Sequence, residues 1–284
     1  MIKIIKYFFQ AIIIYVFFLI SLICRLNLSR KLFSNFFLIF GPFLKSKKII
    51  SENLKTFSPN ISEEKKRLIR EKMWKNYGMT FAEYMFLKKF RNQNSHIAIK
   101  GENILFSVNQ DKPVIFVSGH FANFELMSME ISKKKINLAT IYRPLNNVFL
   151  NPLMEYLRKK YICKNQIKKG LNGVREAIEY IKKNHSIALM IDQRVSEGDK
   201  INFFGKPALT TTLPAQLAIK FNLDIIPVFI ERTDTGNFIL EFKDIIKTNQ
   251  FTDKILLTKK LNEILEQMIK QNPHQWIWTH NRWK

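Results

Sequence analysis

Apolar residues follow two different spacings along the chain, and the two spacings alternate. Short apolar runs are typical of buried strands, whereas apolar residues recurring every three or four positions are typical of amphipathic helices. Strands are predicted at residues 96–99, 114–117, 136–142, 187–191, 225–230 and 238–242. Helices are predicted at residues 62–89, 124–131, 149–159, 174–181, 214–221 and 255–269. This alternation predicts an α/β fold with a mostly parallel central sheet flanked by helices.

A longer apolar run precedes this pattern. Residues 7–24 are interrupted only by Gln10 and Ser21, which meets the minimum of roughly 17–25 residues needed to cross a bilayer. A cleaved signal peptide is the alternative, but no small-x-small cleavage motif follows the run. More basic residues follow the run than precede it, and this bias places the following chain in the cytoplasm. The sequence therefore predicts a single-pass transmembrane helix in the inner (plasma) membrane, with the following domain on the cytoplasmic side.

Residues 32–44 form a second apolar run that is rich in phenylalanine and contains Gly41-Pro42. The run is too short to span a bilayer, and we expect an interfacial helical segment lying on the membrane. The alternative is a helix packed in the hydrophobic core. With no linker or repeat further on, the chain divides into a membrane anchor and interfacial segment, residues 1–48, and one domain, residues 49–284.

Charge narrows the choice of partners. The chain carries 46 basic and 23 acidic residues, a formal net charge of +23, and such an excess is typical of proteins that bind nucleic acid or anionic membranes. Lysine dominates over arginine, and no RNA-binding signature is present. We therefore expect anionic inner-membrane lipids, and no nucleic acid, as partners. The two cysteines, Cys24 and Cys163, predict no disulfide because Cys24 lies in the apolar N-terminal run.

The candidate chemistry centres on His120. It follows the predicted strand 114–117 and Ser118-Gly119, and Glu125 comes five positions later, at the start of a helical pattern. A histidine can act as a general base when a carboxylate orients it. In one regular helix the two side chains would lie roughly 140° apart, so His120 is expected on the turn and Glu125 in the first helical turn. The alternative is a capped helix with a hydrogen-bonded core histidine.

Arg143 and Asp192 also come directly after predicted strands. Functional groups of open α/β sheets gather at the carboxyl ends of the strands, so His120, Arg143 and Asp192 are predicted to converge on one cleft. The alternative is that each residue only caps a turn. His274 and His280 lack further ligands at metal-binding spacing, and no glycine-rich phosphate loop is present. The sequence predicts no metal and no cofactor.

Residues 119–125 resemble the His-x4-acid motif of the lipid A biosynthesis acyltransferases, the lauroyl and myristoyl transferases of Gram-negative inner membranes. Four further blocks resemble the same family, in the same order: Tyr142-Arg143-Pro144-Leu145-Asn146-Asn147, Asp192-Gln193, Phe203-Phe204-Gly205-Lys206-Pro207-Ala208 with Thr210, and the segment from Pro273 through Trp276 and Trp278 to Trp283. The tryptophans of the last block could form a membrane belt or pack against the sheet, and packing is favoured.

The resemblance implies direct transfer of a fatty acyl chain from acyl carrier protein to a hydroxyl of a lipid A precursor, without a covalent acyl-enzyme. His120 and Glu125 would be the catalytic general-base dyad. The implied substrate-binding residues are Arg143, Asn146, Asp192, Phe204 and Gly205. The oligomeric state is not predicted.

Two alternatives remain open. The first is an acyltransferase acting on another glycolipid, a phospholipid or an aminolipid. The second is a non-enzymatic basic protein that binds the membrane surface. A hydrocarbon-lined groove beside His120 would favour the enzyme, and a His120 sealed from solvent would favour the binding protein.

Overall fold

The computed structural model describes residues 2–107 and 112–284 and is built on one seven-stranded sheet. The strands are β1 (Ile97–Lys100), β2 (Ile115–Ser118), β3 (Leu138–Tyr142), β4 (Asn165–Lys168), β5 (Ser186–Met190), β8 (Ile225–Arg232) and β9 (Phe238–Phe242). Their order in the sheet is β1-β9-β8-β2-β5-β3-β4. All neighbours are parallel except β8 and β9. The predicted α/β fold with a mostly parallel sheet is confirmed.

Helices cover the sheet, and this explains why the central strands are apolar on both faces. Every residue of β2 is buried. The helices after the first strand are α6 (Glu102–Ser107), α7 (Glu125–Lys133), α8 (Asn151–Leu157), α9 (Leu171–Lys182), α10 (Leu213–Phe221) and α11 (Lys254–Gln271), with a π-helical turn η2 (Arg158–Ile162) and the 3-10 turns η3 (Thr248–Gln250) and η4 (Pro273–Gln275). Trp276 and Trp278 are buried, so the tryptophans at these two positions pack in the core.

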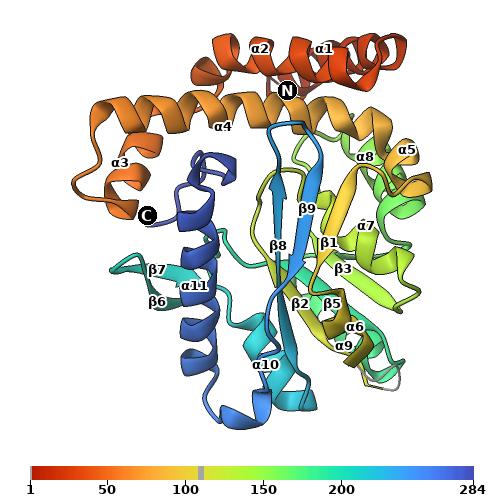
Figure 1. Cartoon of the computed structure of the whole chain (residues 1–284), viewed down its shortest axis with the longest axis vertical. Coiled ribbons are helices and arrows are strands. Elements are labelled where there is room, and N and C mark those ends of the chain that lie inside the picture. Colours follow the sequence, from red (N-terminus) through yellow and green to blue (C-terminus); the bar gives the residue numbers. More distant parts are fainter. Residues whose placement is uncertain (1, 108–111) are drawn as a thin grey trace.

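The helices that precede the sheet begin with α1 (Ile2–Ile23), α2 (Leu26–Leu44), α3 (Lys47–Phe57) and α4 (Glu63–Glu83), and the short helix α5 (Leu87–Asn92) follows them. Figure 1 shows α1, α2 and α4 lying across one end of the sheet, with α4 nearest the strands. The parallel strands β2, β5, β3 and β4 direct their carboxyl ends toward this layer. The N-terminal helices therefore cover the edge at which α/β proteins build their sites.

The first helix carries nearly half of the exposed large apolar side chains of the described residues. Residues Lys3–Ile23 are long and apolar enough to cross a membrane, and only 17% of the most apolar window is buried. Ile4, Phe9, Leu19 and Ile23 are among its exposed large side chains. Such a concentration of exposed apolar side chains on one element is typical of a membrane-facing surface.

The second helix packs closely on α4. A Cβ atom added to Gly78 of α4 would lie 2.1 Å from the carbonyl oxygen of Phe33, and one added to Gly41 would lie 2.4 Å from the Trp74 ring. Both glycines permit an approach that any side chain would block. One face of α2 is thus packed against α4, whereas Phe40 and Phe43 are exposed. The boundary predicted after residue 48 falls in the first turn of α3.

The structure differs from the predicted elements in several places, and the helices α3 and α6 were not predicted. The helix predicted at residues 62–89 is divided into α4, a 3-10 turn η1 (Tyr84–Phe86) and α5 (Leu87–Asn92), because the backbone changes pitch where Tyr84 directs its hydroxyl to Glu125. The short polar strand β4 and the hairpin β6 (Asp199–Phe203) and β7 (Lys206–Thr210) carry no strong apolar pattern and were not predicted.

Candidate active site

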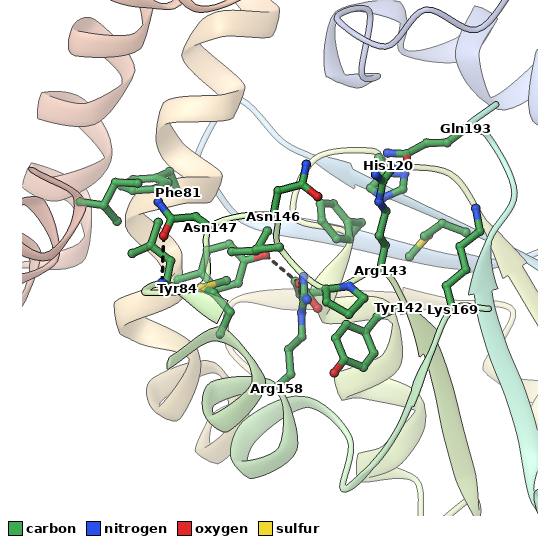
Figure 2. Close-up of a pocket in the computed structure, with 18 of the residues that line it drawn as sticks. Phe81, Tyr84, His120, Tyr142, Arg143, Asn146, Asn147, Arg158, Lys169 and Gln193 are labelled. Atoms are coloured by element: carbon green, nitrogen blue, oxygen red, sulfur yellow. Dashed lines mark hydrogen bonds and ion pairs between the residues drawn. The ribbon is translucent and has the colours of Figure 1, made fainter. Parts of the chain in front are cut away.

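A cavity of about 1160 Å³ opens where the carboxyl ends of the parallel strands meet the N-terminal helices. Figure 2 shows His120, Arg143 and Lys169 on the strand-end side of this cavity and Phe81 on the side of the helices. The apolar lining comes from α1 and α2, with Ile13, Ile14, Phe17, Phe18, Phe36, Phe37, Phe40, Phe43 and Leu44. Much of the polar lining comes from residues that follow the strands, such as His120, Arg143 and Lys169, and from Glu125 of α7 and Arg158 of η2. The cavity can therefore hold a hydrocarbon chain at one side and a polar group at the other.

His120 lies on the turn between β2 and α7, and this turn is held from two directions. Ala122 has a φ of 43°, a left-handed conformation that a residue with a Cβ adopts only when its surroundings impose it. The Thr80 hydroxyl on α4 donates to the Ala122 carbonyl at 2.9 Å, and the Ala122 N–H donates to the Gln275 carbonyl at 3.1 Å. Contacts from α4 and from the C-terminal segment thus fix the position of His120.

The imidazole of His120 is hydrogen-bonded to Asp192, the second residue after β5. His120 Nδ1 lies 2.7 Å from Asp192 Oδ1, and the His120 backbone N–H donates to Asp192 Oδ2 at 2.8 Å. An ionised carboxylate only accepts hydrogen bonds, so Nδ1 carries the proton and Nε2 keeps its lone pair. His120 lines the cavity, and its side chain is 19% exposed. This arrangement leaves a basic nitrogen accessible to a bound molecule.

Asp192 is buried beneath the histidine, and both of its carboxylate oxygens accept hydrogen bonds. The indole Nε1–H of Trp276 donates to Asp192 Oδ2 at 2.9 Å, in addition to the two bonds from His120. Burial alone would raise the pKa of Asp192, but the charge of His120 and the hydrogen bonds from His120 and Trp276 hold that pKa below its ordinary value. The carboxylate therefore stays ionised and keeps the imidazole in one orientation.

Glu125, predicted to orient His120, instead binds Arg158. Glu125 Oε1 accepts hydrogen bonds from Arg158 Nε at 2.8 Å, from Arg158 Nη2 at 2.6 Å and from the Tyr84 hydroxyl at 2.7 Å. Burial would lower the pKa of Arg158, but the charge of Glu125 and the nearby Tyr84 raise it above its ordinary value. A buried carboxylate needs a compensating charge, and Arg158 supplies a permanent one. Among the described residues, Asp192 takes the place that the sequence analysis assigned to Glu125.

A second buried carboxylate supports the same turn. Glu83 of α4 is fully buried, and it accepts hydrogen bonds from Arg30 Nε of α2 at 2.6 Å, from Arg232 at the end of β8, and from the Asn123 amide at 2.9 Å. Asn123 belongs to the turn that carries His120. This cluster therefore connects α2, α4 and the sheet to the turn, and a displacement of α2 would be transmitted to it.

The remaining predicted residues fall into two groups. Arg143 and Asn146 line the cavity with His120 and Glu125. Phe204 and Gly205 form the turn between β6 and β7, where both have positive φ angles, and neither is among the described residues that line the cavity. The Phe204 ring packs against Phe57 and Trp283. The hairpin turn thus lies outside the cavity lining, and the binding role predicted for Phe204 and Gly205 stays a prediction.

Sequence reasoning missed four residues at or beside the cavity: Tyr84, Arg158, Lys169 and Trp276. Tyr84, Arg158 and Lys169 line it, but each stands in a segment with no motif of its own. Trp276 belongs to the C-terminal block noted in the sequence, which could have indicated a role beyond packing. Only the fold brings its indole to Asp192.

Among residues 2–107 and 112–284, no group of three or more His, Cys, Asp or Glu side chains is arranged to hold a metal ion. His280, which the sequence analysis considered as a ligand, instead accepts a hydrogen bond from the Arg194 backbone N–H at 2.9 Å. Burial, together with the charge of Arg282, lowers the pKa of His280 to about 4. This histidine is a neutral structural acceptor at neutral pH.

Comparison with known proteins gives a consistent result over the whole chain. The model of a family described as bacterial lipid A biosynthesis acyltransferase matches residues 2–284. The lipid A biosynthesis palmitoleoyltransferase of Escherichia coli (strain K12) is 24% identical over 253 residues, which cover 86% of this chain and 80% of that protein. The lipid A biosynthesis lauroyltransferase of the same strain is 24% identical over 250 residues, with coverages of 85% and 80%. A lipid A biosynthesis acyltransferase of Haemophilus influenzae is 21% identical over 243 residues.

Proposed function

The chain belongs to the bacterial lipid A biosynthesis acyltransferase family, and we propose that it moves a fatty acyl chain from acyl carrier protein to a hydroxyl of a lipid A precursor. His120 is the general base in this proposal, and Asp192 is the residue that positions it. The proposal keeps the base expected from the sequence and changes its partner from Glu125 to Asp192.

The observation that carries the proposal is the apolar cavity beside His120. A protein that only bound membranes would have no use for an accessible imidazole at the end of a hydrocarbon-lined space. An acyltransferase needs both, because the reacting carbonyl and hydroxyl are attached to fatty chains. The phenylalanines of α2 and the aliphatic residues of α1 supply the wall against which such chains can lie.

The reaction needs few groups. His120 Nε2 removes the proton from the acceptor hydroxyl as its oxygen attacks the carbonyl carbon of the acyl thioester. The carbon–oxygen bond forms and a tetrahedral oxyanion results. Its collapse breaks the carbon–sulfur bond, and the departing thiolate takes the proton from His120. The acyl group moves directly between substrates, so no covalent acyl-enzyme and no cofactor are required.

Asp192 favours this sequence through charge. When His120 holds the proton, its imidazolium faces an ionised carboxylate 2.7 Å from Nδ1, and the pair is stabilised in a buried environment. Glu125 lines the cavity but is neutralised by Arg158. We assign it to the shape and charge of the cavity rather than to proton transfer.

For the donor, the proposal rests on charge. Acyl carrier protein is acidic, and the net charge of +23 gives this chain a complementary surface. For the location, the proposal of a single-pass anchor in the inner membrane with the domain on the cytoplasmic side is supported by the apolar helix α1 and by the basic residues that follow it. A reporter fused after Lys284 should be active in the cytoplasm, and a fusion active only in the periplasm would contradict this orientation.

The test of the function is transfer by purified protein in detergent micelles. Acyl carrier protein loaded with a fatty acid and a lipid A precursor are mixed, and the product is identified by mass spectrometry. His120→Ala should lower turnover about 10²–10⁴-fold. His185→Ala, which removes a histidine outside the cavity lining, is the matched control and should retain activity. Equal turnover by His120→Ala and the wild type would contradict the mechanism, and transfer to a glycerophospholipid alone would contradict the acceptor.

A further inference from the structure

Two basic residues end neighbouring strands on the same side of the cavity. In the parallel pair β3–β4, Tyr142 is in register with Lys168, and the Lys169 N–H donates to the Tyr142 carbonyl at 2.8 Å. The next residues, Arg143 and Lys169, therefore continue the register. Residues in register on adjacent strands lie about 4.8 Å apart in the hydrogen-bonding direction and point to the same face. Figure 2 shows both side chains along one side of the cavity, next to Gln193 and His120.

Such a pair is unfavourable in an empty site, since like charges on directly opposite strand positions repel. Burial and the charge of Arg143 both lower the pKa of Lys169, and Glu197 opposes them only from a distance. Among the described residues, neither Arg143 nor Lys169 forms an ion pair with a carboxylate. By contrast, Lys168 binds Glu155 at 3.1 Å, and Arg158 binds Glu125 at 2.6 Å. Both side chains are exposed at the rim of the cavity, and among the described residues neither has a carboxylate within ion-pair distance.

We propose that Arg143 and Lys169 form a binding site for a phosphate group of a substrate. A phosphate carries up to two negative charges and several acceptor oxygens, so it can accept from the planar guanidinium and the ammonium at once. Because the two cations lie at the rim of the same cavity as His120, the phosphate belongs to a molecule that also reaches the base. This inference rests on the proposed function, since it names what the acyltransferase recognises on its substrate.

The order of the strands indicates how far the phosphate site lies from His120. His120 follows β2, and the order β2-β5-β3-β4 places β3 two strands away, or about 10 Å at the usual spacing. The Arg143 side chain starts two strands away from His120, and in this proposal it binds the phosphate rather than the developing oxyanion. Its role is to hold a distant anionic group and thereby set which hydroxyl meets the base.

The test compares Lys169→Ala with Lys168→Ala, two substitutions one residue apart. Lys168 does not line the cavity, so it controls for the loss of a lysine from this strand. Each enzyme is assayed with a phosphorylated lipid A precursor and with the same lipid after enzymatic removal of its phosphates. Lys169→Ala should raise KM for the phosphorylated acceptor about 10- to 100-fold, as expected for a lost charged hydrogen bond, with kcat little changed. With the dephosphorylated acceptor, Lys169→Ala and the wild type should have equal KM values.

A second arm identifies the source of the phosphate. The donor arm of acyl carrier protein contains a phosphodiester, and an acyl thioester of N-acetylcysteamine lacks it. A KM defect that disappears with the short thioester, and persists with the dephosphorylated acceptor, supports the site and assigns it to the donor. A defect of equal size with every combination of substrates would overturn the proposal, and so would a Lys169→Ala enzyme that matches Lys168→Ala throughout.

A binding measurement separates this inference from the proposed function. His120→Ala protein in micelles cannot turn over, so its equilibrium affinity for the phosphorylated and dephosphorylated lipids can be measured directly. The phosphorylated lipid should bind about 10-fold or more tightly, and Lys169→Ala in the same background should abolish the difference. If the wild type transferred no acyl chain, the proposed function would fail, but this affinity difference would still show whether the site binds a phosphate of the acceptor. Equal affinity for both lipids would exclude the acceptor as the source of the phosphate, and together with a Lys169→Ala enzyme that shows no KM defect toward loaded acyl carrier protein it would overturn the site.

Discussion

Asp192 after β5 and Glu125 at the start of α7 have similar surroundings but hydrogen-bond partners of different chemistry. Both are buried carboxylates beside the turn that carries His120, and each accepts several hydrogen bonds from other elements. Asp192 faces an imidazole, which can gain and lose a proton near neutral pH. Glu125 faces a guanidinium, which cannot. In the proposed mechanism, the carboxylate that assists proton transfer is therefore Asp192, because its partner can change charge.

Neutralising Asp192 should cause the largest loss of activity and is therefore the strongest test of this comparison. Asp192→Asn should keep the shape of the site but offer Nδ1 an amide, which can favour the wrong tautomer of His120. We expect kcat to fall about 10²–10⁴-fold with a much smaller change in KM. Steady-state kinetics in micelles measure both constants. Combining Asp192→Asn with His120→Ala should add little, because the two residues act as a unit. A full additional loss in the double variant would contradict this pairing.

Neutralising Glu125 should mainly affect stability. Glu125→Gln leaves the buried Arg158 guanidinium without its counter-charge, and breaking a buried ion pair typically destabilises a protein by about 3–5 kcal/mol. The midpoint of thermal unfolding in micelles should fall, while kcat per folded molecule should change far less than in Asp192→Asn. A stable Glu125→Gln protein with a kcat as low as that of Asp192→Asn would reverse the comparison and restore the His120–Glu125 dyad predicted from the sequence.

A milder change at the same ion pair tests whether charge or hydrogen-bond geometry holds Arg158 and Glu125 together. Arg158→Lys keeps the positive charge but cannot reproduce the two bonds that Nε and Nη2 donate to Glu125. We expect a loss of about 1–3 kcal/mol in stability, smaller than for Glu125→Gln, and nearly unchanged kcat. The same unfolding assay measures it. A stability loss as large as that of Glu125→Gln would mean that geometry rather than charge holds the pair.

The smallest expected effect is the acid dependence of stability. The pKa of Asp192 is held below its ordinary value in the fold, so its ionised form stabilises the protein. That contribution is complete above the unfolded pKa of about 3.9 and is lost as the pH falls through the lower folded value. The gap in unfolding midpoint between wild type and Asp192→Asn should therefore narrow below about pH 4. Asp244→Asn, at an exposed position, should show no such narrowing.

The regular elements could be predicted because their signals are local. All six predicted strands are present, with boundaries within about two residues, since their apolar runs are long enough to be read without knowing their neighbours. β4 was missed because Asn165–Lys168 reads Asn-Gln-Ile-Lys, which carries one apolar residue. Without β4, the register that brings Lys169 beside Arg143 could not be derived.

The partner of His120 was missed for a related reason. Asp192 is 72 residues from His120 in sequence, and the two meet only because β5 inserts between β2 and β3 in the sheet. Sequence spacing favoured Glu125, which is five positions away. Nearness along the chain says little about which atoms meet once a strand ends and the backbone turns. The strand-end rule nevertheless pointed to Asp192 and Arg143 as residues of the same cleft.

The hydrogen bond from Trp276 to Asp192 can form only late in the synthesis of the chain. The helices that wall the cavity are synthesised first, and every strand of the sheet precedes Trp276. Trp276 follows Asp192 by 84 residues, which at about 5–20 residues per second takes on the order of 10 s. In the proposed anchored arrangement, α1 and α2 would already meet the bilayer during that interval, while the carboxylate beneath His120 still lacks its indole donor. The growing polypeptide would then reach the lipid environment before its proposed active site is complete.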